Sequence, residues 1–135
     1  MHYILDACAL LAFLNDEEGA DTIEELLIQS ATDNSVSMSI VNLLEVYYCE
    51  LRDKGSEIAQ IVLDMVQHYS IKIVNMVSEQ VFHEASRLKT TYKMSLADCI
   101  GIATALELSG QFVTSDHHEL GSMAENEPTC IFWFR

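Results

Sequence analysis

Proline, glycine and basic residues are scarce in this chain. One of its 135 residues is proline and five are glycine, so no segment has the composition of a disordered tail or a low-complexity linker. No internal repeat is present. Half of the residues are hydrophobic, and a chain of this length can bury a core of its own. We therefore expect a single domain over residues 1–135.

Signals for export, membrane insertion and zinc binding are also missing. The N-terminal apolar run has no basic segment before it and is interrupted by Asp6. The longest strongly apolar helical pattern, Leu96 to Leu108, is shorter than the roughly 20 residues that span a bilayer. Four cysteines form no CxxC pair and have no histidine at zinc-ligand spacing: Cys8, Cys49, Cys99 and Cys130. We expect no membrane association, a cytoplasmic location and buried reduced thiols, although wide spacing does not exclude disulfides.

Positive charge is the third scarcity. Seven Lys and Arg stand against 21 acids, for a net charge of −14, and proteins that hold nucleic acid by charge alone are basic. The chain should repel a phosphate backbone unless cations or a local basic patch reverse the field. Arg87, Lys89 and Lys93 form such a patch before Asp98 and are candidates for binding substrate phosphates; an ordinary solvated helix face is the alternative. No Walker or GxGxxG loop is present, which disfavours nucleotide cofactors.

Short apolar runs alternate with helical patterns along the chain. The expected strands are residues 2–6, 35–38, 71–74, 112–114 and 130–134. Apolar residues at helical spacing predict helices at about 7–15, 20–30, 39–51, 58–66, 78–92 and 95–110. Alternating strands and helices predict an α/β fold, here a three-layer α/β/α sandwich with a mostly parallel central sheet of four to five strands.

Four acidic residues lie within or directly after these apolar segments: Asp6, Glu45, Asp98 and Asp116. Two of them end predicted strands, at the sheet edge where open parallel sheets bind ligands, and the two helical acids can face the same edge. Two carboxylates 4 Å apart repel by about 4 kcal/mol at an effective dielectric of 20, so a cluster would take up protons or bind a dication. Oxygen ligands favour Mg²⁺ or Mn²⁺, and such ions can hold a phosphodiester and activate water.

Each acid also has a purely structural explanation. Asp98 follows Ser95 at capping-box spacing, and Asp6 can cap the helix after it. Asp116 fits an ordinary turn, and Glu45 fits an exposed helix position. The joint occurrence of strand-end acids on one side of the predicted sheet favours the metal site.

Three further features have open interpretations. Asn42 either reaches the acidic cleft or bonds within its helix. His117 and His118 can bind a transition metal, although an exposed loop pair without a third nitrogen ligand is the favoured interpretation. The C-terminal run CIFWF can supply a homodimer face, while core burial explains it equally well.

Four strings, in this order and spacing, resemble the PIN domain, most closely VapC-like toxins of type II toxin–antitoxin systems: YILDACALLAFL, SIVNLLEVYY, LADCIGIATALEL and FVTSDHHEL. The resemblance implies Mg²⁺- or Mn²⁺-dependent endoribonuclease activity on an RNA substrate. It assigns metal ligation to Asp6, Asp98 and Asp116, and orientation of the attacking water to Glu45. Thr114 would orient the last acid or a metal-bound water. A small antitoxin with a basic segment and a homodimer are the implied partners.

Two departures from the family pattern leave an alternative open. Many relatives carry Ser or Thr where this chain has Cys8, which removes a supporting hydroxyl, and the net charge disfavours RNA affinity. The alternative is a catalytically weak or inactive binding module with the same fold. A phosphoryl-transfer or receiver domain is less consistent, since Asp6 has no acidic neighbour and no lysine ends a suitable strand.

Overall fold

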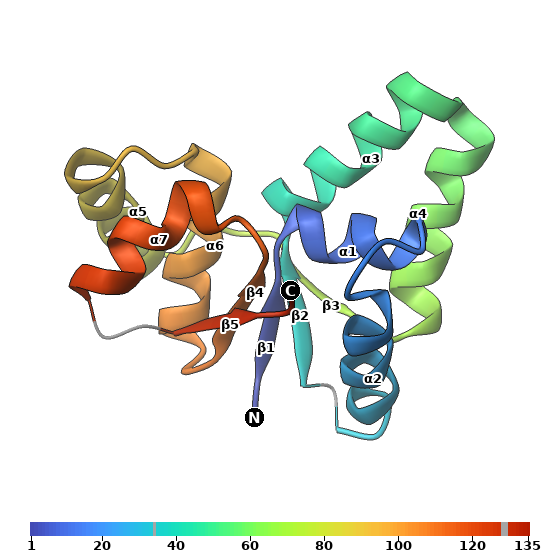
Figure 1. Cartoon of the computed structure of the whole chain (residues 1–135), viewed down its shortest axis with the longest axis horizontal. Helices are drawn as coiled ribbons and strands as arrows, with labels where there is room; N and C mark the ends of the chain where they lie inside the picture. Colours follow the sequence, from blue (N-terminus) through green and yellow to red (C-terminus); the bar gives the residue numbers. More distant parts are fainter. Residues whose placement is uncertain (34, 128–129) are drawn as a thin grey trace.

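The computed structural model describes residues 1–33, 35–127 and 130–135. Within these ranges seven helices flank a five-stranded, all-parallel sheet of order β3-β2-β1-β4-β5 (Figure 1). The strands are β1 (Tyr3–Leu5), β2 (Val36–Ser39), β3 (Lys72–Val74), β4 (Gln111–Thr114) and β5 (Ile131–Trp133). The helices are α1 (Ala7–Leu14), α2 (Ala20–Ser30), α3 (Ile40–Lys54), α4 (Ser56–His68), α5 (Glu79–Thr91), α6 (Leu96–Glu107) and α7 (His117–Asn126). The predicted α/β class and parallel sheet are confirmed.

Successive strand residues bury their side chains in opposite layers. Ile4 and Leu5 are both fully buried, but Leu5 belongs to the core formed with α1–α4, and Ile4 to the core formed with α5–α7. Phe112 and Val113 of β4 divide between the two cores in the same way. This follows from the two-residue period of a strand. The helices accordingly form two layers, α1–α4 on one side of the sheet and α5–α7 on the other (Figure 1).

Serine caps begin three of the helices. The Oγ atoms of Ser39, Ser78 and Ser95 accept hydrogen bonds at 3.1 Å from backbone N–H groups in the first turns of α3, α5 and α6. Each bond satisfies a donor that lacks a partner within the helix. The expected starts of these helices are confirmed.

Helix α7 was not predicted, and the expected loop at His117 and His118 is wrong. Both histidines are exposed, but they form the first turn of this helix. The His117 ring stacks on Trp133 with centroids 3.9 Å apart, and its Nε2 lies 2.8 Å from the backbone oxygen of Arg135. His117 therefore faces the C-terminal segment, whereas His118 lines a cavity together with Lys93 and Glu119. Among the described residues, neither histidine belongs to a group of side chains that could share a metal ion.

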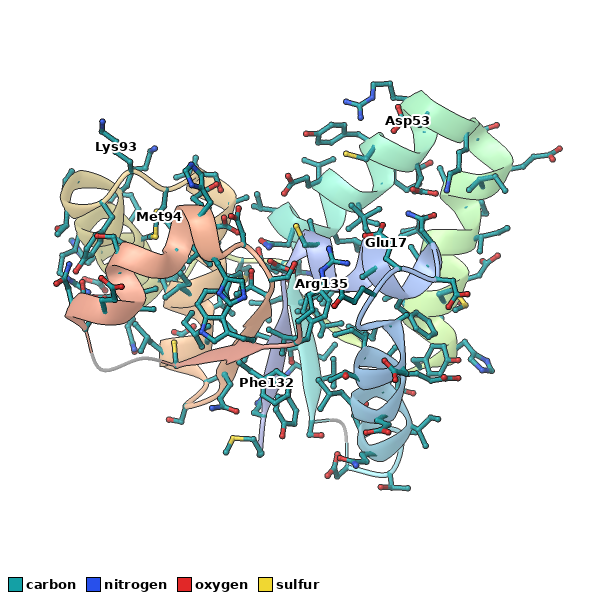
Figure 2. The ribbon with its side chains drawn as sticks, in the orientation of Figure 1. Glu17, Asp53, Lys93, Met94, Phe132 and Arg135 are labelled. Atoms are coloured by element: carbon teal, nitrogen blue, oxygen red, sulfur yellow. The ribbon has the colours of Figure 1, made fainter. Side chains whose placement is uncertain are left out.

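The C-terminal segment packs onto the body of the domain. Phe134 is buried, and Arg135 Nη1 lies 3.2 Å from Glu17 Oε1 (Figure 2). Gly19 has a positive φ of 87°, and a Cβ there would lie 2.6 Å from the Phe134 ring, so both its backbone and its lack of a side chain fit this contact. Core packing thus accounts for much of the CIFWF run.

Large exposed apolar side chains lie instead on α3, α5 and α6: Leu44, Tyr48, Phe82 and Leu96. The cysteines are all free, and the expectation that they are buried holds only for Cys99, because Cys8 is exposed and the other two are half-buried. Among the described residues, no helix has the length and apolar character needed to cross a membrane.

Candidate metal centre

The sheet reverses its strand order between β1 and β4. From β1 the chain moves outward to β2 and β3, whereas β4 and β5 lie on the other side of β1. Leu5 pairs with Val113, so Asp6 and Thr114 come next to each other at the carboxyl ends of their strands. The loops after such strands diverge and leave a crevice, which is where open α/β sheets bind ligands.

This crevice holds a cavity of about 120 Å³. It is lined by Asp6, Ala7, Cys8, Glu45, Ser95, Asp98, Asp116 and Glu119. All four predicted acids therefore converge from four separate parts of the chain, and a fifth acid joins them. At about 30 Å³ for each water, the cavity has room for about four waters or a partly hydrated ion.

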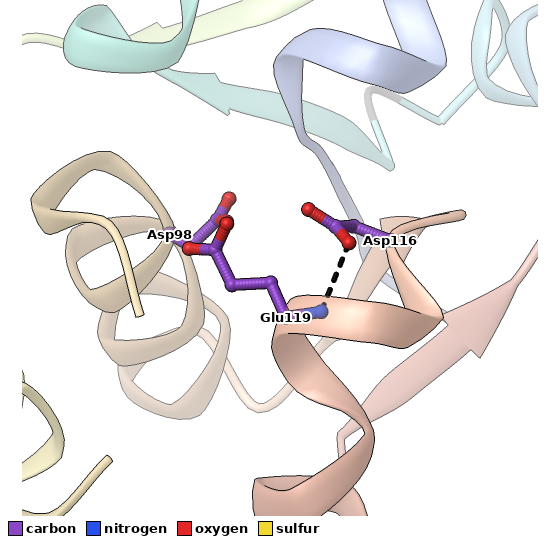
Figure 3. Close-up of side chains that lie close together, drawn as sticks. All are labelled: Asp98, Asp116 and Glu119. Atoms are coloured by element: carbon purple, nitrogen blue, oxygen red, sulfur yellow. Dashed lines mark hydrogen bonds between the residues drawn. The ribbon is translucent and has the colours of Figure 1, made fainter. Parts of the chain in front are cut away.

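Both strand-end acids, Asp6 and Asp116, cap helices in addition to lining the cavity. Asp6 Oδ1 accepts a hydrogen bond from Ala9 N at 2.7 Å, and Asp116 Oδ1 accepts one from Glu119 N at 3.0 Å (Figure 3). A cap uses one carboxylate oxygen and fixes the side chain. The structural and functional explanations of these acids are therefore compatible, and the turn expected at Asp116 is a helix start.

In a capping box, the Asp98 side chain would accept a hydrogen bond from the backbone N–H of Ser95. Here Oε1 of Glu119 accepts that bond instead, although Glu119 lies on another helix. The Asp98 carboxyl faces Glu119 and Asp116, and one carboxylate oxygen of each of the three lies within 4.8 Å of the others (Figure 3). Two unit charges at this distance repel by about 3.5 kcal/mol at an effective dielectric of 20.

Thr114 supports both strand-end acids. Its side chain is fully buried, and its Oγ1 accepts a hydrogen bond from Asp116 N at 3.2 Å. Its hydroxyl also interacts with the Asp6 carboxyl, which lowers the pKa of that group. One hydroxyl thus links the ends of β1 and β4. The family resemblance implied a contact with the carboxylate of the last acid, but here the hydroxyl contacts the backbone N–H of Asp116 and the carboxyl of Asp6.

The cavity shifts the protonation of its acids. Burial raises the pKa of Asp6 to about 7, against the opposing effects of Thr114 and the Ala9 N–H. Burial, followed by the charges of Asp6 and Glu119, raises the pKa of Asp98 well above its ordinary value. Burial also acts to raise the pKa of Glu119, but hydrogen bonds from Ser95 and Asp98 bring it below the ordinary range. Without a cation, Asp98 is therefore the member of this pair that is protonated more easily.

The donor set fits a hard dication. Carboxylate oxygens are the ligands that Mg²⁺ and Mn²⁺ prefer. Burial first, and neighbouring carboxylates second, raise the pKa of Asp6 and Asp98, so their charged forms are costly without a counter-ion. A dication would supply positive charge in place of protons. Asp98, Asp116 and Glu119 are the three acids whose oxygens approach one another most closely.

Glu45 lies at the margin of the centre. It is half-buried in the second turn of α3, and burial together with the charge of Glu119 raises its pKa. Sequence reasoning missed Glu119 because no helix was expected after Asp116; the spacing Asp116-x-x-Glu119, which is that of a capped first turn, was the available signal.

Of the residues predicted to bind substrate, some lie next to the acidic cavity and others do not. Lys89 and Lys93 line a larger cavity beside the acidic one, whereas Arg87 binds Glu84 and Glu127 on another part of the surface, with Nη2–Oε1 distances of 2.5 and 2.7 Å. Asn42 is fully buried, and neither polar atom of its side chain has a partner within the described residues. Asn42 is therefore closed off from substrate in this structure, and Arg87 is held by two carboxylates.

Cys8 contributes an uncharged wall. Although Cys8 is exposed as a residue, desolvation of its thiol and then the charges of four surrounding acids raise the pKa of that thiol to about 12. The thiol is therefore neutral at physiological pH.

Comparisons with known proteins bear on the family and the fold. A family model described as PIN domain matches residues 3–125. Among curated proteins, no significant match is found.

Solved structures of toxin–antitoxin proteins share the fold. VapBC2 from Rickettsia felis, bound to a DNA fragment from its promoter, has 19% identity and a TM-score of 0.78, with 98% of each chain covered. DNA-bound VapBC from Salmonella typhimurium has 15% identity and a TM-score of 0.74, with 100% and 99% covered. The sarcin–ricin loop cleaving toxin VapC20 from Mycobacterium tuberculosis has 14% identity and a TM-score of 0.69, with 89% and 94% covered.

Proposed function

The chain belongs to the PIN domain family, and from that premise we propose that it is a metal-dependent endoribonuclease, the toxin of a toxin–antitoxin pair. The observation that carries the proposal is the convergence of five acids from distant segments on one small cavity at the switch point of the sheet. One of the similar structures is a toxin that cleaves the sarcin–ricin loop, which supports RNA as the substrate class.

Each acid has a role that its position suggests. Asp6, Asp98 and Asp116 would hold Mg²⁺ or Mn²⁺, together with Glu119. When bound, the ion would supply Lewis acidity toward a phosphodiester and its attacking water. Glu45 lines the same cavity and has a raised pKa, so its carboxylate can orient that water and accept its proton. The Thr114 hydroxyl keeps Asp6 and Asp116 in place.

Cleavage by matched variants tests the proposal. Asp98→Asn should abolish Mn²⁺-dependent cleavage of RNA, because it removes one ligand charge at nearly constant volume. Asp64→Asn, the same change at an exposed position on α4, should cleave like the wild type. Circular dichroism should show both variants folded. Full activity of Asp98→Asn would refute the assignment of the site.

The second candidate is a binding module that cuts nothing. Two observations favour it: the net charge of −14 and a thiol at Cys8, where a hydroxyl would be a better support. Calorimetric titration with Mn²⁺ separates the two candidates. Heat that saturates in the micromolar to low millimolar range supports the nuclease, and no binding at millimolar Mn²⁺ supports the module.

An antitoxin is the proposed protein partner. Two of the similar structures are VapBC toxin–antitoxin complexes, and an acidic cavity in so acidic a protein suits a basic peptide segment. An arginine from that segment would compete with the dication for the same carboxylates. A small protein encoded next to this chain should inhibit cleavage when purified with it, and truncating its basic segment should relieve the inhibition.

We also propose a homodimer that acts in the cytoplasm. The exposed apolar side chains of α3 and α6, such as Leu44 and Leu96, favour the helices over the CIFWF run as its interface. Light scattering without an antitoxin should give twice the monomer mass at micromolar concentration. A monomer throughout that range would contradict self-association.

A further inference from the structure

A second cavity adjoins the acidic centre. Its volume is about 920 Å³, and it lies over the connection between α5 and α6 and the first turns of α7. Its lining includes Lys89, Tyr92, Lys93, Ser95, His118 and Glu119. Ser95 and Glu119 also line the acidic cavity, so the two spaces share a wall. A chain bound at the acidic centre can continue into the larger cavity.

Unpaired positive charge gathers at this cavity. Of the seven Lys and Arg residues, four form ion pairs with carboxylates: Arg52, Lys54, Arg87 and Arg135. In the part of the chain that the structure describes, Lys72, Lys89 and Lys93 have no such partner, and two of these three line the cavity. Because most cations are neutralised elsewhere, this is where the acidic protein offers positive charge to a ligand.

The two lysines are held differently. Lys89 Nζ donates to the backbone oxygen of Met94 at 2.6 Å, which ties the end of α5 to the loop before α6. Lys93 is exposed and projects from that loop beside Met94 (Figure 2). Lys89 thus presents a fixed charge with donors remaining, and Lys93 presents a mobile one. Both suit phosphate oxygens, which accept hydrogen bonds from ammonium groups in many orientations.

We propose that this cavity binds the phosphates of the RNA strand on one side of the scissile bond, with Lys93 and Lys89 as its phosphate contacts. The inference rests on the proposed function and specifies where the substrate runs: from the acidic centre, over Ser95 and Glu119, toward the α5–α6 connection. Arg87 takes no part, because Glu84 and Glu127 hold it. His118 and the Tyr92 ring form the walls against which sugar and base can pack.

The salt dependence of binding tests this path. For single strands, log K falls with log salt concentration by about 0.7 for each phosphate contact, which is about fivefold in affinity at 0.1 M salt. Lys93→Gln should reduce the slope by about 0.7 and weaken binding about fivefold. Lys93→Arg should restore both. Lys72→Gln removes the same charge from β3, at an exposed position, and should change neither.

The assay uses the full chain and a fluorescein-labelled 12-nucleotide oligouridylate. Anisotropy is measured between 50 and 200 mM NaCl with Ca²⁺ present, and a gel verifies that the RNA stays intact. Mn²⁺ affinity, measured by calorimetry without RNA, should be the same for the wild type and the lysine variants. If the wild type binds RNA in Ca²⁺ and cleaves it in a separate reaction with Mn²⁺, while Lys93→Gln keeps the salt slope of the wild type, the path is refuted and the proposed function stands. If the wild type binds no RNA, both are refuted.

Discussion

Neutralising Asp6 should stabilise the protein in the absence of metal. The Asp6 side chain is 3% exposed, and burial raises its pKa from 3.8 to about 7. An acid whose pKa is raised on folding binds more protons in the folded state, so its contribution to stability is present below pH 4 and is lost as the pH rises to 7. A shift of about 3 pKa units corresponds to about 4 kcal/mol.

Asp6→Asn isolates this effect. Asparagine keeps an oxygen that can accept the Ala9 N–H bond and is an equally good cap, but it carries no charge. The variant should be more stable than the wild type by about 4 kcal/mol at pH 8 and by about 2 kcal/mol at pH 5. Asp64→Asn, the same substitution at an exposed position on α4, should leave the free energy of unfolding unchanged at both pH values.

The assay is urea unfolding in EDTA, followed by far-UV circular dichroism at pH 5 and pH 8. A dication at one hundred times its Kd should narrow the difference at pH 8 without reversing it, because it stabilises the wild type by about 2.7 kcal/mol and the variant by less. If Asp6→Asn gave no gain at pH 8, or a gain that did not shrink at pH 5, the buried charge would not be the source of instability.

Three further substitutions or reactions probe the centre and its support. Glu119→Gln keeps an acceptor for the Ser95 N–H and removes a negative charge. Calorimetry should therefore show that the affinity for Mn²⁺ falls by about ten- to a hundredfold. An unchanged Kd would mean that Glu119 only caps α6 and does not bind the metal. The pKa of the Cys8 thiol is raised to about 12, so iodoacetamide at pH 8 should alkylate it slowly. We expect a rate at least about a hundredfold below that of a peptide cysteine with a pKa near 8.5. Equal rates, measured by peptide mass spectrometry, would contradict the charge of the cavity. Gly101→Ala would place a Cβ 2.4 Å from the Phe112 ring, so urea unfolding should show a loss of about 1–3 kcal/mol; an unchanged midpoint would contradict this contact between α6 and β4.

The sheet and three of its strand-end or helix-start acids were predictable from local pattern. Alternating strands and helices imply a parallel sheet, and a parallel sheet brings Asp6 and Asp116 to one edge whatever its strand order. The side chain of Asp98 follows from its place in a capped first turn. These inferences need only the period of the apolar residues and the direction of the strands.

Helix α7 was not predictable in the same way. Its sequence, HHELGSMAEN, contributes only Leu120 and Met123 to the core, which is too little periodicity to distinguish a helix from a loop. Glu119 was missed along with it. Its bond to Ser95 joins residues 24 positions apart, and no local pattern reports such a contact.

The basic cluster shows a second limit. Arg87, Lys89 and Lys93 lie within seven residues of one another. A helix turns residues two apart, such as Arg87 and Lys89, toward different sides, and Lys93 lies beyond the end of α5. The pair with Glu84, three positions away, was visible in the sequence, while the pair with Glu127 depends on how α7 ends. The burial of Asn42 was likewise not predictable from the sequence, because only the packed structure shows that its side chain is enclosed.

A crystal of the protein soaked in Mn²⁺ tests the central claim most directly, because anomalous scattering locates the ion without reference to activity. The account predicts a peak between the carboxylates of Asp98, Asp116 and Glu119, with ligand distances of about 2.1 Å. A crystal with no peak at these acids, or with manganese bound only elsewhere, would contradict it.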